Sequence, residues 1–233
     1  MKSSASPTFP AFRPEDLLGP LNVVEAHHAP EQLFVAGAIG LLKLGTRVSI
    51  VGSRQASDLG LRRARKLARE LAEQGVVIVS GLAKGIDTAA HRAAIDAGGK
   101  TVAVLGTPLD RTYPAENRAL QALIMDEHLA VSQYPIGYPV RPGNFPRRNR
   151  TMALLSNATV IVEAGETSGS LSQGWEALRL GRNLFVLESV AEDKSLKWPQ
   201  EMISYGAEVL SSTEQLLEAL PMDVGGSLAS LTF

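Results

Sequence analysis

Short apolar runs recur along the 233-residue chain, and most are followed by a segment with helical spacing. Between Leu61 and Leu71, for example, apolar residues recur three or four positions apart and Gly75 then provides a stop. The predicted strands are 33–37, 47–51, 76–79, 101–105, 129–134, 158–164, 183–188 and 208–210. The predicted helices are 57–75, 88–97, one after Pro114, 148–156, 170–181, a weaker one before 208, and 213–220. Apolar strands that alternate with helices predict a doubly wound, mostly parallel α/β sheet of the Rossmann-like type.

The same pattern divides the chain into three parts. Five prolines interrupt residues 1–45, which we expect to form a partly helical lead-in that packs on the core. Residues 46–220 carry the regular alternation and are expected to form one domain. Residues 221–233 are expected to be a C-terminal tail. The charged stretch from Arg62 to Glu70 is interpreted as the solvated face of a helix.

Composition narrows the chemistry that the chain can perform. The absence of cysteine excludes disulfides, thiolate zinc sites, iron–sulfur clusters and cysteine nucleophiles. With 23 Lys and Arg against 24 Asp and Glu, the protein is not generally basic, although phosphate binding needs only a local basic surface. No window approaches about 18 consecutive apolar residues, and the first residues lack the apolar run of a secretory signal. We therefore expect a cytoplasmic protein with no membrane partner.

Common catalytic and cofactor motifs are absent from the sequence. It contains no GxxxxGK[ST], GxGxxG, HExxH, EF-hand or GxSxG pattern. The four histidines are scattered, and His91 is expected to pack within the fold. We therefore expect no cofactor, no metal site and no catalytic residue, and a protein that binds its ligand without being an enzyme.

Three predicted strand-to-helix turns are rich in small residues. Such turns let backbone N–H groups approach an anion, and the helix N-termini behind them carry partial positive charge. In a parallel sheet these turns meet at the carboxyl ends of the strands, where ligands bind. The candidate phosphate-binding residues in them are Gly52, Ser53, Arg54, Ser80, Gly81, Lys84, Gly85, Ser168, Gly169 and Ser170.

A second candidate segment is 141–150, in which four arginines surround one phenylalanine. Guanidinium groups bind phosphates, and an aromatic ring held in a loop offers a surface for an unstacked base. The candidate residues are Asn144, Phe145, Arg147, Arg148 and Arg150. The alternative is a structural loop, in which the arginines pair with nearby carboxylates and Phe145 fills a place in the core.

Several segments together resemble the DNA processing protein A (DprA/Smf) family. They are VSIVGSR, the long stretch VVIVSGLAKGIDTAAHRAAIDAGGKTVAVLGTPLDRTYPAENRAL, the run PGNFPRRNRTMALLSNATVIVEA, and SGS before a later helix. They span roughly Leu33 to Leu220 in the order of the family. The resemblance implies an extended Rossmann-like fold, single-stranded DNA binding, a homodimer, and a RecA-type recombinase as partner during natural transformation. It also implies that Arg54, Lys84 and Phe145, with Arg147, Arg148 and Arg150, lie in the DNA-binding pocket.

Three departures from the family pattern qualify these expectations. Family members usually carry flanking domains, so the chain is interpreted as a compact member without them. The segment after SGS reads SLSQGWEALRLGR in place of the family's TA-containing helix, and SVAEDKSLKWPQ replaces a glycine-rich segment. These changes fall on the far side of the predicted pocket.

An alternative function on the same fold is a nucleotide-binding sensor or a phosphoribohydrolase-like enzyme. Aligning Gly169 and Ser170 with the GT of that enzyme signature places Gln173 where a catalytic Glu should stand. An amide cannot act as a carboxylate base, which disfavours the reaction. Glu163 and Glu176 are close in sequence and keep the alternative open.

Overall fold

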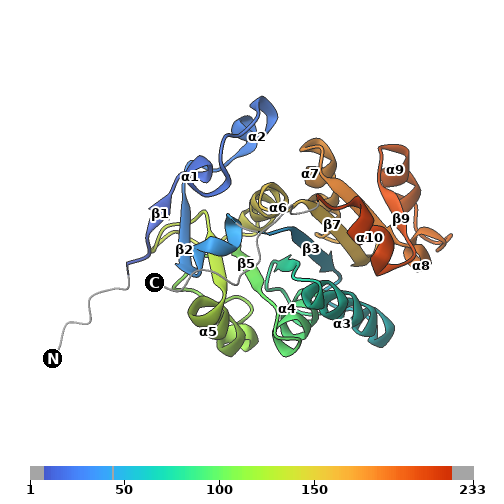
Figure 1. The fold of residues 1–233 in the computed structure, drawn as a ribbon, viewed down its shortest axis with the longest axis horizontal. Helices are drawn as coiled ribbons and strands as arrows, with labels where there is room; N and C mark the ends of the chain where they lie inside the picture. Colours follow the sequence, from blue (N-terminus) through green and yellow to red (C-terminus); the bar gives the residue numbers. More distant parts are fainter. Residues whose placement is uncertain (1–7, 44, 222–233) are drawn as a thin grey trace.

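The computed structural model describes residues 8–43 and 45–221, so the predicted tail at 221–233 lies outside the described residues except for Pro221. Within these ranges nine strands form one sheet in the order β1-β2-β6-β5-β4-β3-β7-β8-β9 (Figure 1). The strands are β1 (Ala11–Phe12), β2 (Leu33–Gly37), β3 (Arg47–Gly52), β4 (Val77–Ser80), β5 (Thr101–Leu105), β6 (Leu129–Ser132), β7 (Ala158–Glu163), β8 (Asn183–Leu187) and β9 (Glu208–Leu210). Strands β3 to β9 run parallel, which confirms the predicted fold class, and β1 and β2 are antiparallel at one edge.

Helices cover both faces of this sheet. They are α1 (Pro14–Leu18), α2 (Val23–His28), α3 (Asp58–Glu73), α4 (Ile86–Asp96), α5 (Arg118–Glu127), α6 (Asn144–Leu154), α7 (Leu171–Arg179), α8 (Glu188–Ala191), α9 (Trp198–Ser204) and α10 (Thr213–Ala219), with short 3-10 helices η1 (Ile39–Leu42) and η2 (Ala115–Asn117). Helices α3, α4, α5 and α10 pack on one face, and α1, α6, α7 and α9 pack on the other (Figure 1). None of the described helices has the length and the apolar character needed to cross a bilayer.

The two apolar layers follow from the alternation of side chains along each strand. In β4, Ile78 packs with the helices α3 and α4, whereas Val77 and Val79 pack on the opposite face with Met152 of α6. On α3, the exposed basic side chains lie opposite the buried face that includes Leu67, as the sequence predicts for a solvated helix.

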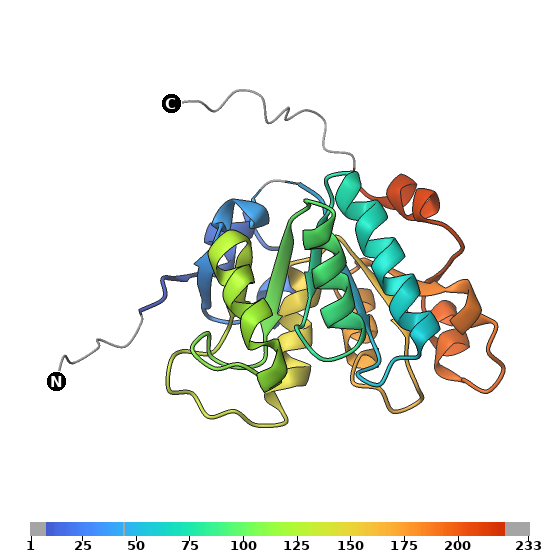
Figure 2. The same cartoon turned by 90° about the horizontal axis from the view of Figure 1, so that it is seen from below.

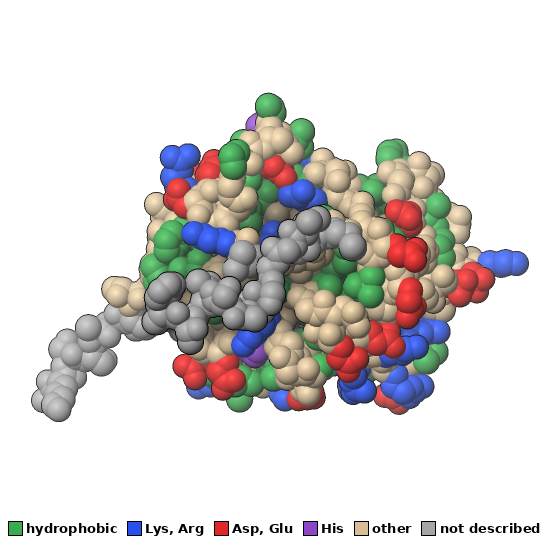
Figure 3. Space-filling model, in the orientation of Figure 1, with side chains coloured by type: hydrophobic (Ala, Val, Ile, Leu, Met, Phe, Trp, Pro, Cys, Tyr) green, Lys and Arg blue, Asp and Glu red, His purple; other side chains and the backbone are tan. Residues whose placement is uncertain are grey.

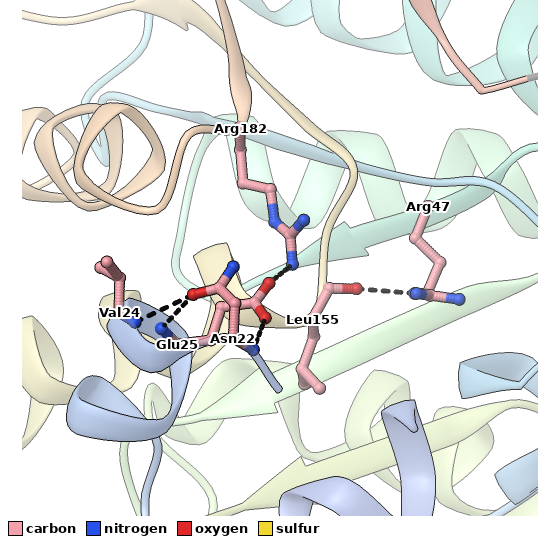
Figure 4. A network of polar contacts seen from close by, with 6 residues as sticks. All are labelled: Asn22, Val24, Glu25, Arg47, Leu155 and Arg182. Atoms are coloured by element: carbon pink, nitrogen blue, oxygen red, sulfur yellow. Dashed lines mark hydrogen bonds and ion pairs between the residues drawn. The ribbon is translucent and has the colours of Figure 1, made fainter. Parts of the chain in front are cut away.

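The N-terminal segment is fixed to the sheet by backbone pairing and by a polar network. Strand β2 pairs with β6, so this segment extends the sheet. The side chain of Asn22 accepts hydrogen bonds of 2.9 Å from the N–H groups of Val24 and Glu25, which caps α2 (Figure 4). The carboxylate of Glu25 then binds Arg182, which lies between α7 and β8, at 2.5 Å. Helix α2 is therefore held by a salt bridge to a residue distant in sequence.

Several observed boundaries differ from the predicted ones for local reasons. Helix α4 begins at Ile86, two residues before the prediction, because Gly85 turns the chain with a φ of 74°. Helix α6 begins at Asn144 and includes Pro146, which is tolerated because a proline in the first turn gives up no helical hydrogen bond. The weaker helix predicted before 208 consists of the two short helices α8 and α9.

The topology defines the place where a ligand is expected. The strand order reverses between β3 and β7, whose following chains lead to opposite sides of the sheet. In Figure 2 the loops that follow β3 (blue), β6 (yellow-green) and β7 (orange) lie along the same lower edge of the molecule. The predicted convergence of the strand-to-helix turns is therefore present at the carboxyl ends of the parallel strands.

Candidate nucleic-acid interface

A cleft of about 600 Å³ lies at the point where the strand order reverses. It is formed by the turn after β3, the loop after β4, the N-terminal half of α6 and the turn after β7. Open α/β sheets bind their ligands at this position. Residues that line it include Gly52, Arg54, Asp87, Phe145, Arg148 and Gly169.

The turn after β3 is packed tightly and presents one arginine. A Cβ at Gly52 would lie 2.6 Å from the side chain of Ile86 and 2.7 Å from the carbonyl oxygen of Glu163, so only glycine fits. The N–H of Ser53 donates to that same carbonyl at 2.7 Å. The exposed side chain of Arg54 extends from this fixed turn, and its guanidinium carbon lies 5.5 Å from the centre of the Phe145 ring. We refer to Arg54 and Phe145 as the rim pair.

Phe145 is neither a buried core residue nor a free aromatic surface. It is half-buried, and its ring packs so closely on Gly106 that a Cβ there would lie 2.6 Å from the ring. The ring of Tyr113 lies beside it, with 5.2 Å between the two centroids. Arg54 lies over the ring, in an arrangement that the negative face of an aromatic ring favours. The cleft therefore has a combined cationic and aromatic surface at its mouth.

Arg148 forms part of the floor of the cleft, and the donors on its Nε and Nη1 are used inside the protein. It is only 5% exposed, and its Nη1 donates to the carbonyl oxygens of Gly81 at 2.5 Å and Val104 at 2.6 Å. Asp87 accepts hydrogen bonds from the N–H groups of Gly81 at 3.0 Å and Ala83 at 3.3 Å. Burial raises the pKa of Asp87, and the Arg148 guanidinium opposes that rise. Arg148 thus ties α6 to the loop after β4, which differs from the exposed position that the sequence suggests for it.

The other basic residues predicted in the site have different surroundings. Lys84 lies near the rim pair and forms an ion pair of 2.6 Å with Glu116, with both side chains about half exposed. Arg147 is exposed on α6. Arg150 turns toward α7, where it pairs with Glu176 at 3.3 Å. Of the segment's arginines, Arg150 therefore matches the structural alternative, in which an arginine pairs with a nearby carboxylate.

The remaining predicted residues divide between the cleft lining and its support. Ser168, Gly169 and Ser170 line the cleft, and the two serine hydroxyls lie 2.6 Å apart. Residues that support it from inside the protein are Ser80, which donates to the carbonyl of Ile50 at 2.7 Å, Asn144, which donates to the carbonyl of Pro139 at 3.1 Å, and Gly85, where a Cβ would collide with the carbonyl of Ser53. The structure brings the three predicted turns together, and a direct DNA contact by each residue stays a prediction.

Three residues of the site were missed in the sequence. Asn149 joins α6 to the turn after β7, because its amide donates to the carbonyl of Gly169 at 3.1 Å and to the hydroxyl of Ser172 at 2.6 Å. Asp87 lies beneath the loop after β4, and Tyr113 lies beside Phe145. Of these three residues, only Tyr113 could have been singled out in the sequence, because aromatic residues are rare, at 5% of the chain.

The fold and the cleft define the class of this protein as a doubly wound, Rossmann-like α/β protein with an arginine-bearing site at the switch point of its sheet. Within the described ranges, no group of three or more His, Asp or Glu residues is placed to hold a metal ion. A family model described as DNA recombination-mediator protein A matches residues 12–221. The chain belongs to this family.

Individual relatives agree with this assignment. The chain is 41% identical to DNA processing protein DprA of Streptococcus pneumoniae over 90% of its own length and 73% of the relative. It is 43% identical to protein Smf of Synechocystis over 74% of its length, and this match spans 44% of that protein. The solved structure of DNA processing protein A from Helicobacter pylori, described for its single-stranded DNA binding mode, superposes with a TM-score of 0.74 at 28% identity, covering 91% of this chain and 98% of that one.

Proposed function

We propose that this protein binds single-stranded DNA in the switch-point cleft and acts in DNA processing linked to recombination. The family membership and the Helicobacter pylori relative support this role. The structural observation that carries the proposal is the rim pair, in which the Arg54 guanidinium lies 5.5 Å from the centre of the Phe145 ring at the mouth of the cleft. Single strands are bound by combining cations for the backbone with planar surfaces on which bases stack.

The shape of the site favours a single strand over a duplex. The cleft is bordered by turns and by the first residues of α6, so its walls can take an unstacked nucleotide but present no long helix to a groove. The exposed guanidinium groups of Arg54 and Arg147 can contact phosphates outside the cleft. Since these contacts read no base edge, we expect little sequence preference.

The alternative of nucleotide sensing or cleavage has less support. Gln173, the residue aligned with a catalytic Glu, is fully buried. The carboxylate of Glu163 accepts hydrogen bonds from the N–H and hydroxyl of Ser57 at 2.8 and 2.5 Å, and it fills the N-terminus of α3. Glu176 pairs with Arg150 and lies 3.8 Å from Arg179. Because these carboxylates are already engaged, we favour binding without catalysis.

The test is a set of titrations with labelled oligo-dT, duplex DNA and a panel of mononucleotides at two salt concentrations. We expect oligo-dT to bind more tightly than duplex, and binding to weaken as salt rises. Arg54→Ala should weaken oligo-dT binding about tenfold and reduce the salt slope by about 0.7, since roughly one counterion fewer is released. Arg69→Ala, which removes an exposed arginine on α3, is the matched control. Equal or tighter duplex binding would contradict the proposal.

We also propose a homodimer, because a single cleft would contact only a few nucleotides. Sedimentation at tens of micromolar should show the dimer, and a monomer alone would reject it.

A RecA-type recombinase is the proposed protein partner, on the basis of the family's description as recombination mediators. Co-sedimentation of the recombinase with this protein on oligo-dT tests that interaction, and recombinase loading unchanged by the protein would reject it.

A further inference from the structure

Tyr113 is an aromatic side chain with an exposed ring next to the cleft. The residue is 50% exposed. Aromatic residues are rare in this chain, at 5% of its length. One side of the ring is used in the contact with Phe145, in which the ring planes are inclined by 48°. Proteins that bind single-stranded nucleic acids use such aromatic rings as surfaces on which successive bases stack.

The space between Tyr113 and the rim pair is too small for a base. A separate pocket of about 50 Å³ is lined by Arg54, Lys84, Tyr113 and Phe145 among others. A water molecule occupies about 30 Å³, so this pocket holds one or two waters. The rings of Tyr113 and Phe145 are also in contact, with 5.2 Å between their centroids, so the outer surface of Tyr113 is the one that can take a nucleobase.

Two cations lie near Tyr113 at the mouth of the cleft. Arg54 and Lys84 line the small pocket together with Tyr113. Figure 3 shows the face of the molecule at the amino ends of the parallel strands, where Asp and Glu side chains gather over the part formed by α8, β9 and α10. This acidic face lies away from the cleft. A polyanion that leaves the cleft past Tyr113 meets the guanidinium of Arg54 and the ammonium of Lys84, which is paired with Glu116, so this path is favoured.

We propose that Tyr113 is a second base-stacking surface, so that a strand held at the rim pair continues across the tyrosine ring beside Lys84. This inference rests on the proposed function, because it extends the same site by one position. The contribution of Tyr113 comes from the ring and not from its hydroxyl group, since each base offers a flat face to it. Its effect is therefore independent of base sequence and of salt.

The test compares four proteins in titrations with a length series of labelled oligo-dT. Tyr113→Ala should weaken binding about tenfold for the longer oligonucleotides, while leaving the salt slope unchanged. The same variant should bind the shortest ones like the wild type, because these reach only the rim pair. Tyr113→Phe should bind within about twofold of the wild type. Tyr205→Ala removes another exposed tyrosine, 69% exposed and packed on Trp175 of α7, and should have no effect.

A second measurement keeps the inference testable if Tyr113→Ala is unstable. Tyr113→Trp places an indole at this position, and stacking of a base should quench its fluorescence when oligo-dT binds. The inference is overturned if Tyr113→Ala binds every length like the wild type, if Tyr113→Phe is as weak as Tyr113→Ala, or if the indole signal does not change. These outcomes concern Tyr113 alone. Failure of the wild type to bind oligo-dT would instead overturn the proposed function.

Discussion

Arg54 and Arg148 line the same cleft, yet their guanidinium groups have different tasks. Arg54 is exposed and lies over Phe145, so its donors remain available to a ligand. Arg148 is buried and donates to the carbonyls of Gly81 and Val104. A guanidinium carries five donors in a fixed plane, and a donor that already holds a carbonyl cannot bind a phosphate. The contrast between rim and floor leads us to expect that the number of donors left available, more than the residue type, decides which arginine can bind a ligand.

The largest expected effect is a loss of stability when Arg148, on the floor of the cleft, is replaced. Arg148→Ala would leave the Asp87 carboxylate buried without its opposing charge and two carbonyls without their donor. We expect the free energy of unfolding to fall by about 3–5 kcal/mol, measured by urea denaturation. Arg54→Ala is the control and should change it by less than about 0.5 kcal/mol. If Arg148→Ala kept wild-type stability but lost DNA binding, the distinction between the two arginines would be wrong.

Phe145 belongs to the rim pair and also packs on the protein interior, so its replacement should affect both DNA binding and stability. Phe145→Ala removes packing on Gly106 and the surface under Arg54. Full burial would cost about 3–5 kcal/mol, so for this half-buried ring we expect a loss of about 2 kcal/mol in thermal or urea unfolding. DNA binding should weaken while its salt slope stays unchanged, because no charge is removed. Phe145→Leu keeps most of the volume and should recover stability without recovering affinity. Wild-type affinity in Phe145→Ala would make the residue purely structural.

Lowering the pH should reduce the stability of the protein through a buried histidine without changing ligand binding at the rim pair. His91 on α4 is buried with its Nδ1 at 2.7 Å from the Thr101 hydroxyl, and burial lowers its pKa from 6.5 to about 3. Between these two values the unfolded chain binds a proton that the folded protein does not. Stability should therefore fall as pH drops below about 6.5, by up to about 1.4 kcal/mol per pH unit.

Two measurements check this pH dependence. Urea denaturation of His91→Gln should show a flatter dependence between pH 7 and 5 than the wild type, and an unchanged slope would contradict the assignment. Some dependence will remain, because burial also lowers the pKa of His128. A guanidinium group is protonated at every pH in this range, so the salt slope of DNA binding by the folded protein should not change.

The smallest expected effect is a change in DNA affinity when Lys84, near the rim pair, loses its ion-pair partner. Lys84 and Glu116 form an exposed ion pair, a type that contributes about 0–1 kcal/mol to stability. Glu116→Gln should free the ammonium group for a phosphate, so oligo-dT should bind about two- to threefold more tightly with a slightly steeper salt slope. Glu73→Gln, which removes an exposed carboxylate at the far end of α3, should leave the affinity unchanged. Weaker binding by Glu116→Gln would show that Glu116 positions Lys84 and does not mask it.

The sheet could be predicted because its signal is local. Strand β5 has the predicted bounds 101–105, and the alternation of apolar runs with helices was sufficient to assign parallel strands. The meeting of three turns at one edge follows from that topology. The antiparallel direction of β2 could not be predicted, since an isolated apolar run carries no information on which neighbour it joins.

The assignment of tasks within the site depends on contacts between distant residues. Arg148 is buried because Gly81 leaves room for its guanidinium: a Cβ at that glycine would collide with it. The partner of Lys84 lies on η2, well beyond the motif that contains Lys84. Neither contact can be predicted from the amino-acid composition of the segment 141–150. Its arginines therefore look alike in the sequence, and only the packing separates Arg147 from Arg148 and Arg150.

The carboxylate of Glu163 sets a limit on how this domain can be redesigned. Dinucleotide-binding domains leave the N-terminus of the first helix open for a pyrophosphate. Here the chain supplies its own anion, and a Cβ at Gly60 would collide with that carboxylate. An engineer who wished to install a nucleotide in this place would have to remove Glu163 and also give Ser57 a new partner. We expect replacement of Glu163 alone to lower stability, because Ser57 loses its partner before any nucleotide can bind. A step-by-step route from this domain to a nucleotide-binding one would therefore pass through a less stable sequence.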